Sequence, residues 1–120
     1  MAEPELQGPT LAIDGRDTGW PVRRAESALA RARGLLWGKD AASEAFLALR
    51  PCRGVHTFGM RRSIDVVFTD RHGRVRRICT SLRPWRMAWV PGAVTAWEAP
   101  AGVVARLGIR EGVTLEACER

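Results

Sequence analysis

Short runs of β-branched and aromatic residues, separated by turn signals, cover most of the chain, and this pattern predicts strands. We expect strands at residues 10–14, 20–24, 55–60, 64–69, 73–82, 87–90, 94–99 and 113–117. Asp70-Arg71-His72-Gly73 is typical of a hairpin turn between two of them, because Gly73 can adopt a positive φ without steric cost. The pattern therefore predicts an antiparallel sheet that is sandwich-like or barrel-like.

Helical spacing is clear in one region of the chain. Apolar residues recur at i, i+3, i+4, i+7, i+10 and i+11 from Ala25 onward, so we expect one main helix within Ala25–Trp37. A short second helix is expected at residues 101–107, where Gly108 provides a C-terminal cap. Residues 40–49 fit both a helix and a short buried strand, and periodicity leaves both open.

Length and composition favour a single α+β domain. The chain has 120 residues, of which 46% are hydrophobic and 27% charged, and this suits a compact, β-rich domain over residues 10–120. Residues 1–9 combine prolines, a glycine and glutamates, so we expect a flexible tail. The acidic N-terminus lacks an apolar core, and no apolar stretch is long enough to span a membrane; a cytoplasmic location is therefore expected.

Positive charge is concentrated in one segment. The chain carries a net charge of +6, and residues 50–86 alone hold ten arginines against two acids, which gives +8. Such a polarity favours an anionic partner. Eighteen of the nineteen basic residues are arginine, which a GC-rich coding sequence would also produce, so functional and codon-based explanations both stay open.

Several motifs of this chain resemble one family. They are Arg33-Gly34-Leu35-Leu36, the run from Leu49 to Met60 that ends in His-Thr-Phe-Gly-Met, the run Ile-Asp-Val-Val-Phe at residues 64–68, Leu82-Arg83-Pro84-Trp85-Arg86 and Pro100-Ala101-Gly102. In this order they are similar to the domain of unknown function 192 family, and the resemblance covers residues 28–116. It implies a compact, β-rich domain with one or two helices, and it implies that residues 46–50 are a strand. It implies no activity.

The chain also departs from the family pattern. Arg62-Ser63 stands where similar members usually carry Phe-Pro, and this adds charge beside the His-Thr-Phe-Gly-Met run. The resemblance therefore implies no ligand preference shared with the family at this place.

A cluster of metal-binding residue types occurs near residue 56. His56, Phe58 and Met60 share one face of the predicted strand, because side chains alternate along a strand, and Cys52 lies four residues upstream. Cys, His and Met suit a Cu(I) site. Packing of Phe58 and Met60 in the core is the alternative, and the irregular spacing favours it. We expect no metal, no cofactor and three free thiols, at Cys52, Cys79 and Cys118.

Asp65 lies within an apolar predicted strand, so we expect its carboxylate to be at least partly buried. A buried carboxylate needs a partner, and neighbouring arginines are candidates for an ion pair. The functional alternative is a carboxylate that orients a ligand or acts as a general base. Structural pairing is the interpretation that the pattern favours.

The segment Arg83-Pro84-Trp85-Arg86 places an aromatic side chain between two guanidinium groups. Such a segment stacks on a base or holds a phosphate in some proteins. Alternatively, Trp85 packs on the sheet while the arginines extend to water. We expect Trp85 to pack, and the role of the arginines stays open.

These residues lead to one candidate ligand-binding site, formed by His56, Asp65, Arg83, Trp85 and Glu98. Trp85 and Phe58 would form its wall, Arg83 would supply charge, and the two carboxylates would orient the ligand. No catalytic motif occurs in the sequence, so we expect a binding protein rather than an enzyme and no catalytic residues.

Three functions are consistent with the sequence, which does not define an activity. The first is a small binding or accessory module that presents a basic groove to an anionic small molecule or an acidic protein surface. The second is non-specific nucleic-acid binding through the arginine-rich segment 50–86, which we expect to be weak at physiological salt. The third is a small hydrolase or transferase that uses Asp65, His56 or Glu98. Membrane binding is not expected.

Overall fold

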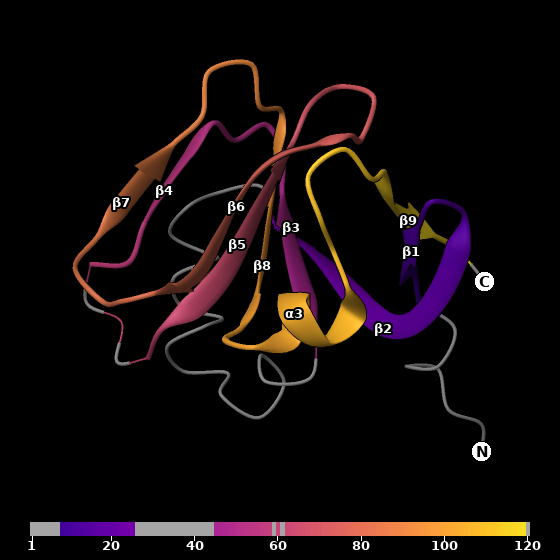
Figure 1. The fold of residues 1–120 in the computed structure, drawn as a ribbon, viewed down its shortest axis with the longest axis horizontal. Helices are drawn as coiled ribbons and strands as arrows, with labels where there is room; N and C mark the ends of the chain where they lie inside the picture. The colour runs from indigo at the N-terminus through magenta and orange to yellow at the C-terminus, as the bar shows by residue number, and fades with distance from the viewer. Residues whose placement is uncertain (1–7, 26–44, 59, 61, 120) are drawn as a thin grey trace.

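One mixed β-sheet organises the part of the chain that the structure, a computed structural model, describes: residues 8–25, 45–58, 60 and 62–119. Its strands are β1 (Thr10–Ile13), β2 (Arg16–Ala25), β3 (Phe46–Leu49), β5 (Ile64–Thr69), β6 (Val75–Leu82), β8 (Thr95–Pro100) and β9 (Leu115–Cys118). The strand order is β6-β5-β8-β3-β2-β1-β9 (Figure 1). All neighbours are antiparallel except β2 and β3, which are parallel.

Two smaller elements complete the described fold. Strands β4 (Gly54–His56) and β7 (Met87–Trp89) pair as a separate antiparallel ribbon, and β7 lies at the outer edge of the molecule (Figure 1). Helix α3 (Val103–Leu107) follows β8 and ends at Gly108, which has a left-handed conformation. The β4–β7 ribbon and α3 lie against opposite faces of the large sheet.

The register of β5 with β8 defines these two faces. Asp65 lies opposite Ala99 and Val67 opposite Trp97, whereas the next pair along the strand is Val66 with Glu98. Paired residues share a face and successive residues alternate, so Asp65 and Glu98 point to opposite sides of the sheet.

One face, called here the helix face, is covered by β1, β9 and α3. Leu11 of β1, Leu115 of β9 and Val104 of α3 pack there with Val67 and Trp97 in one buried cluster. β2 joins β1 to the central strands, since residues 16–21 pair with β1 and residues 22–25 pair with β3.

The opposite face, called here the ribbon face, is covered by the β4–β7 ribbon. Val55 and Ala88 of the ribbon pack on Val66 and Phe68 of β5, and Met60 joins the same cluster. The domain therefore has an apolar cluster on each side of its central strands.

Most predicted strands are confirmed, but the sheet differs from the prediction in two respects. The parallel pairing of β2 with β3 makes the sheet mixed instead of antiparallel. An isolated bridge from Arg74 to Thr114 joins the start of β6 to the segment before β9, and the sheet is not a closed barrel. The predicted hairpin at Asp70–Gly73 is confirmed, and Gly73 has φ +80°.

The helix predictions have different outcomes. The short helix predicted at residues 101–107 is confirmed as α3. The main helix within Ala25–Trp37 is not confirmed: Ala25 is the last residue of β2, and residues 26–44 lie outside the described part, as do residues 1–7 of the predicted tail. Residues 46–49 form β3, as the family resemblance implied. No helix of the described residues is long and apolar enough to cross a membrane.

The strand predicted at residues 55–60 is shorter than expected. β4 ends at His56, and the N–H of Met60 donates to the carbonyl of Thr57 in a tight turn. The turn separates Met60, which is buried, from Phe58 and His56, which face solvent. The expected alternation of His56, Phe58 and Met60 on one face is therefore wrong.

Candidate functional site

Asp65 is fully buried, and its partners are backbone groups of distant segments. Oδ1 accepts a hydrogen bond from the N–H of Ser81 at 2.8 Å. Oδ2 accepts from the N–H groups of Gly102 and Val104, both at 3.0 Å. The expected arginine partner is thus replaced by three peptide N–H donors, each of which stabilises a carboxylate.

These hydrogen bonds give Asp65 a structural role. Gly102 precedes α3 and has no side chain to cap the helix, so the carboxylate of Asp65 supplies the acceptor from the neighbouring strand. On the other side, Asp65 holds Ser81, which has φ +52° at the irregular end of the β5–β6 pairing. Asp65 therefore fixes the junction of β5, β6 and α3.

The five residues expected to form one site do not converge. Asp65 faces α3 on the helix face, whereas Glu98 is fully buried on the ribbon face. His56, Arg83 and Trp85 are exposed, and they belong to β4 and to the loop that leads into β7. Their separation follows from the period of two along β5 and β8, which turns neighbouring positions to opposite faces.

Three of the aromatic rings that were expected at this site, those of His56, Phe58 and Trp85, do lie together at the surface. The rings of His56 and Phe58 have centroids 4.9 Å apart, and Phe58 stacks on Trp85 at 5.6 Å with an interplanar angle of 23°. Trp85 is 64% exposed, so the expectation that it packs on the sheet is wrong. These rings lie on the solvent side of the ribbon.

A buried threonine organises the loop that carries Trp85. The hydroxyl of Thr57 donates to the carbonyl of Arg83 at 2.6 Å and accepts from the N–H of Arg86 at 2.9 Å. The carbonyl of Thr57 accepts from the N–H of Trp85 at 3.0 Å, and its N–H donates to the carbonyl of Arg86 at 2.9 Å. The loop is therefore held by four hydrogen bonds of one residue.

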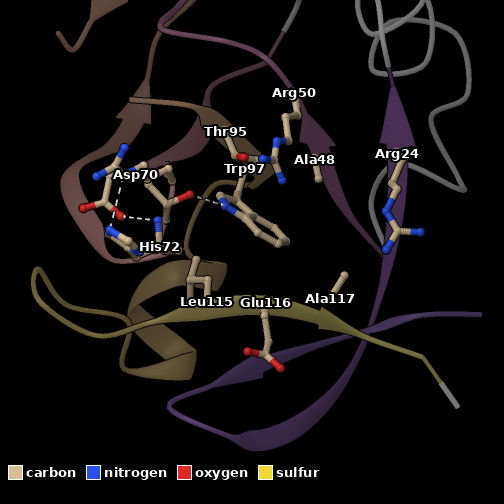
Figure 2. Close-up of a pocket in the computed structure, with 13 residues that line it drawn as sticks. Arg24, Ala48, Arg50, Asp70, His72, Thr95, Trp97, Leu115, Glu116 and Ala117 are labelled. Atoms are coloured by element: carbon tan, nitrogen blue, oxygen red, sulfur yellow. Dashed lines mark hydrogen bonds between the residues drawn. The ribbon is translucent and has the colours of Figure 1, made fainter. Parts of the chain in front are cut away.

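A pocket opens at another place, on the helix face. It has a volume of about 530 Å³ and lies between the ends of β3 and β8 on one side and β9 on the other (Figure 2). Its lining residues are Arg24, Ala48, Arg50, Thr69, Asp70, Arg71, His72, Gly73, Thr95, Trp97, Leu115, Glu116 and Ala117.

The inner part of the pocket is apolar with fixed polar groups. The indole of Trp97 lies at its centre in Figure 2, and its Nε1–H donates to the hydroxyl of Thr69 at 3.0 Å. Ala48 and Leu115 flank the indole, and Thr95 contributes a hydroxyl. The hydrogen bond holds the indole ring in one orientation at the floor of the pocket.

The rim of the pocket is predominantly basic. Arg24, Arg50, Arg71 and His72 are exposed lining residues. Arg24 also forms an exposed ion pair with Glu119 at 3.2 Å, which at the surface contributes little stability. These guanidinium groups come from three separate chain segments.

The two acids of the lining, Asp70 and Glu116, make their described contacts with groups other than the guanidinium groups of the rim. Oδ1 of Asp70 accepts from the N–H groups of His72 at 2.9 Å and Arg74 at 3.0 Å, and Oδ2 lies 3.7 Å from Arg76. Burial acts to raise the pKa of Asp70, but these hydrogen bonds and the electrostatic effects of His72 and Arg76 hold the pKa below its ordinary value. The carboxylate of Glu116 points away from Trp97 (Figure 2).

The sequence contains only weak signals for this pocket. Arg50 belongs to the basic segment 50–86, but the local patterns indicate only a turn at His72 and a strand at Trp97. Arg24 comes near Arg50 because β2 and β3 are parallel, with Arg24 opposite Ala48. No local pattern predicts a parallel pairing of this kind.

A metal centre has no support among the described residues. No three His, Cys, Asp or Glu side chains of that part lie close enough to hold an ion. Met60 is buried while His56 is exposed, so the Cu(I) grouping considered above does not assemble. Cys52, Cys79 and Cys118 are each half-buried and belong to separate segments.

Comparison with known proteins places the chain in a family. The model of the DUF192 family, described as "Uncharacterized ACR", matches residues 10–117. The chain belongs to the DUF192 family. A UPF0127 protein of Pyrococcus horikoshii is 35% identical to this DUF192 domain over 100 residues, which cover 78% of this chain and 85% of that protein.

Two solved structures share the fold of this DUF192 domain. A protein of unknown function from Novosphingobium aromaticivorans has a TM-score of 0.72 at 21% identity, covering 90% of this chain and 83% of its own. A putative transcription regulator from Sinorhizobium meliloti has a TM-score of 0.67 at 23% identity, covering 80% of each chain. At these identities the likeness concerns the fold alone.

Proposed function

We propose that this DUF192 domain is a small binding module whose pocket beside Trp97 holds an anionic small molecule. The observation that carries the proposal is a flat apolar floor and a basic rim within one cavity of about 530 Å³. Cavities of about 300–1,000 Å³ with an apolar lining and a few polar groups are typical of small-molecule sites.

The lining also indicates the chemistry of the ligand. Trp97 and Ala48 offer apolar surface, and Thr95 offers a hydroxyl beside it. Arg24 and Arg50 suit a carboxylate or phosphate, because guanidinium groups form two charge-assisted hydrogen bonds with such groups. The pocket therefore suits an anion attached to a planar or aliphatic body. Its concave shape favours a small molecule over an acidic protein surface.

An enzymatic function has less support. The oxygens of Asp65 accept three backbone hydrogen bonds, and a general base needs a lone pair directed at a substrate. His56 and Glu98 lie on other parts of the domain. A catalytic group formed by these three residues would require the strands to separate.

Native mass spectrometry of gently purified protein tests whether a ligand is retained. We expect an adduct with the mass of a small organic anion, and we expect Arg50→Glu to remove it. Arg110→Glu is the matched control, because Arg110 is exposed and does not line the pocket. An adduct equally reduced in both variants would contradict the proposal.

A defined fluorescent probe tests the pocket even if the natural ligand is lost during purification. Anilinonaphthalene sulfonate combines planar rings with an anionic group, and its fluorescence reports binding. We expect Arg50→Glu to weaken its binding about tenfold, which is ~1.4 kcal/mol, and Arg110→Glu to leave it unchanged. Equal weakening by both substitutions, or no binding to the unaltered protein, would overturn the assignment.

A further inference from the structure

Strand β7 of the ribbon exposes its large apolar side chains to solvent instead of packing them against the sheet. In β7, Ala88 faces the core and is 9% exposed, whereas Met87 and Trp89 on either side are 71% and 60% exposed. A strand that only covered a core would place its large apolar residues inward and its small residue outward. Packing on the ribbon face therefore does not explain Met87 and Trp89.

The loop before β7 and the turn after β4 extend the same surface. Phe58 is 45% exposed and Trp85 is 64% exposed, and the two rings stack. Phe58, Trp85, Met87 and Trp89 are the exposed large hydrophobic residues of the described part of the chain. Single exposed apolar residues are normal, but a group of them on one element marks an interaction surface.

The backbone also holds Trp85 in an unfavourable conformation. Its φ is +65°, in the left-handed region that residues with a Cβ rarely adopt. Thr57 fixes this conformation through its hydrogen bonds to Arg83, Trp85 and Arg86. Strain of this kind occurs preferentially at functional positions, where the surrounding structure maintains it.

The charge of the surface determines the kind of partner. In the sequence, residues 50–63 and 83–94, which include the two ribbon strands, contain six arginines and no acid. The guanidinium of Arg53 lies 5.7 Å from the ring centroid of Trp89, and Arg83 and Arg86 flank Trp85 and are exposed. The surface thus combines aromatic rings with positive charges and suits a partner that is both flat and anionic.

We propose that the solvent face of the β4–β7 ribbon binds single-stranded nucleic acid through Phe58, Trp85 and Trp89, with Arg53, Arg83 and Arg86 on the phosphates. Unpaired bases stack on exposed aromatic side chains irrespective of sequence, and a basic surface follows the backbone. A duplex hides its base faces, so the aromatic residues discriminate against it. This surface is separate from the pocket beside Trp97, and neither proposal depends on the other.

Salt dependence gives the first quantitative expectation. If three arginines each neutralise one phosphate, the logarithm of affinity falls with the logarithm of salt concentration with a slope of about −2, since each single-strand contact contributes about −0.7. Arg53→Ala and Arg86→Ala each reduce the slope by about 0.7. Arg110→Ala, the same change on an exposed residue away from the ribbon, leaves it unaltered.

Substitutions at Trp85 separate stacking from general apolar contact. The experiment is fluorescence anisotropy of a labelled fifteen-base oligothymidine at low salt, with the full chain. We expect Trp85→Leu to weaken binding about tenfold, because it removes the stacking ring, and Trp85→Phe to retain most of the affinity. Circular dichroism of each variant shows whether the fold is intact.

Several results would overturn the assignment. Absence of oligonucleotide binding at low salt is one, and equal affinity for a duplex of the same length is another. Full affinity of Trp85→Leu would show that stacking has no part, and would indicate an apolar protein partner instead. The combination of a slope near −2, preference for the single strand and rescue by Trp85→Phe is the result that the proposal predicts.

Discussion

The central strands and the ribbon contain similar residues and use them in opposite ways. In β5 and β8 every large apolar side chain is buried, and even Asp65 and Glu98 are enclosed. In β7 the small residue is buried and the large ones are exposed. The buried carboxylate of Asp65 holds backbone groups of the fold, whereas the exposed Met87 and Trp89 have no packing role on the sheet and are candidates for function.

The largest predicted effect tests the structural role of Asp65. Asp65→Ala leaves three N–H groups without their acceptor, one of them buried and two partly buried, and each costs about 1–3 kcal/mol, so we expect a loss of about 3–5 kcal/mol in the free energy of unfolding. Urea denaturation measures the loss. Glu111→Ala, at an exposed position, is the control. A loss below about 1 kcal/mol would return Asp65 to the list of functional candidates.

Alanine substitutions at two glycines with similar φ compare how tightly the two sides of the domain are packed. Gly73, in the β5–β6 hairpin, has φ +80°, and a Cβ there would lie 2.7 Å from the carbonyl oxygen of Leu115. Gly92, in the turn after β7, has φ +85° and no atom within 4 Å of its Cβ position. We expect Gly73→Ala to cost about 3 kcal/mol and Gly92→Ala about 1 kcal/mol, because only the first adds a clash to the strain. Equal losses in thermal unfolding would show that the enclosed side is no more tightly packed than the ribbon side.

Thr57 connects the fold of the ribbon to its exposed rings. Thr57→Val keeps the side-chain volume and removes the hydroxyl, so the N–H of Arg86 and the carbonyl of Arg83 lose a buried partner, at a cost of about 2 kcal/mol. Thr57→Ser retains the hydroxyl and is expected to lose less. If the two variants unfold at the same denaturant concentration, the hydroxyl does not hold the loop.

Trp85 is predicted to contribute little to stability. Trp85→Gly relieves the positive φ, which is worth about 1 kcal/mol, and removes the stacking contact with Phe58, which is worth a similar amount. The net change in unfolding free energy is therefore expected to be below about 1 kcal/mol. A loss of several kcal/mol would mean that Trp85 is a packing residue after all.

The smallest predicted effect is the pH dependence of stability that arises from Asp70, a residue of the pocket lining. Because the pKa of Asp70 is below its ordinary value of 3.8, the stabilisation from its charge is fully present above that value and is lost as the pH falls through the lower folded-state pKa. Asp70→Asn keeps an acceptor and removes the charge. We expect the variant to be less stable than the unaltered protein at pH 7 and the difference to shrink towards pH 3 in chemical denaturation. A constant difference would assign the effect to the hydrogen bonds alone.

Local patterns in the sequence predicted the elements well. The run at residues 64–69 is a strand with those bounds, and the turn at Asp70–Gly73 and the helix before Gly108 are present. These features depend on side-chain alternation and on glycine conformations, which neighbouring residues determine. The prediction of a strand at residues 55–60 was too long, because Thr57 ends the strand through hydrogen bonds to Arg83 and Arg86, which lie far along the chain.

The sites were less predictable, because they too depend on contacts between segments that are far apart in the sequence. The donors to the carboxylate of Asp65 are the backbone N–H groups of Ser81, Gly102 and Val104, and peptide groups leave no mark in a sequence. The motif Met87-Ala88-Trp89 fits either orientation of a strand, and hydrophobicity favours the one that does not occur. Arg24 and Arg50 meet only through the parallel pairing of β2 with β3.

One NMR measurement tests the division between the two surfaces most directly. The indole N–H signals of the ¹⁵N-labelled protein report on Trp97 in the pocket and on Trp85 and Trp89 on the ribbon, and single Trp→Phe variants assign them. We expect oligothymidine to shift the Trp85 and Trp89 signals and to leave Trp97 unchanged, and anilinonaphthalene sulfonate to shift Trp97 and to leave the other two unchanged. Movement of the same signals by both ligands, or of none by either, would contradict the assignment of two separate binding surfaces.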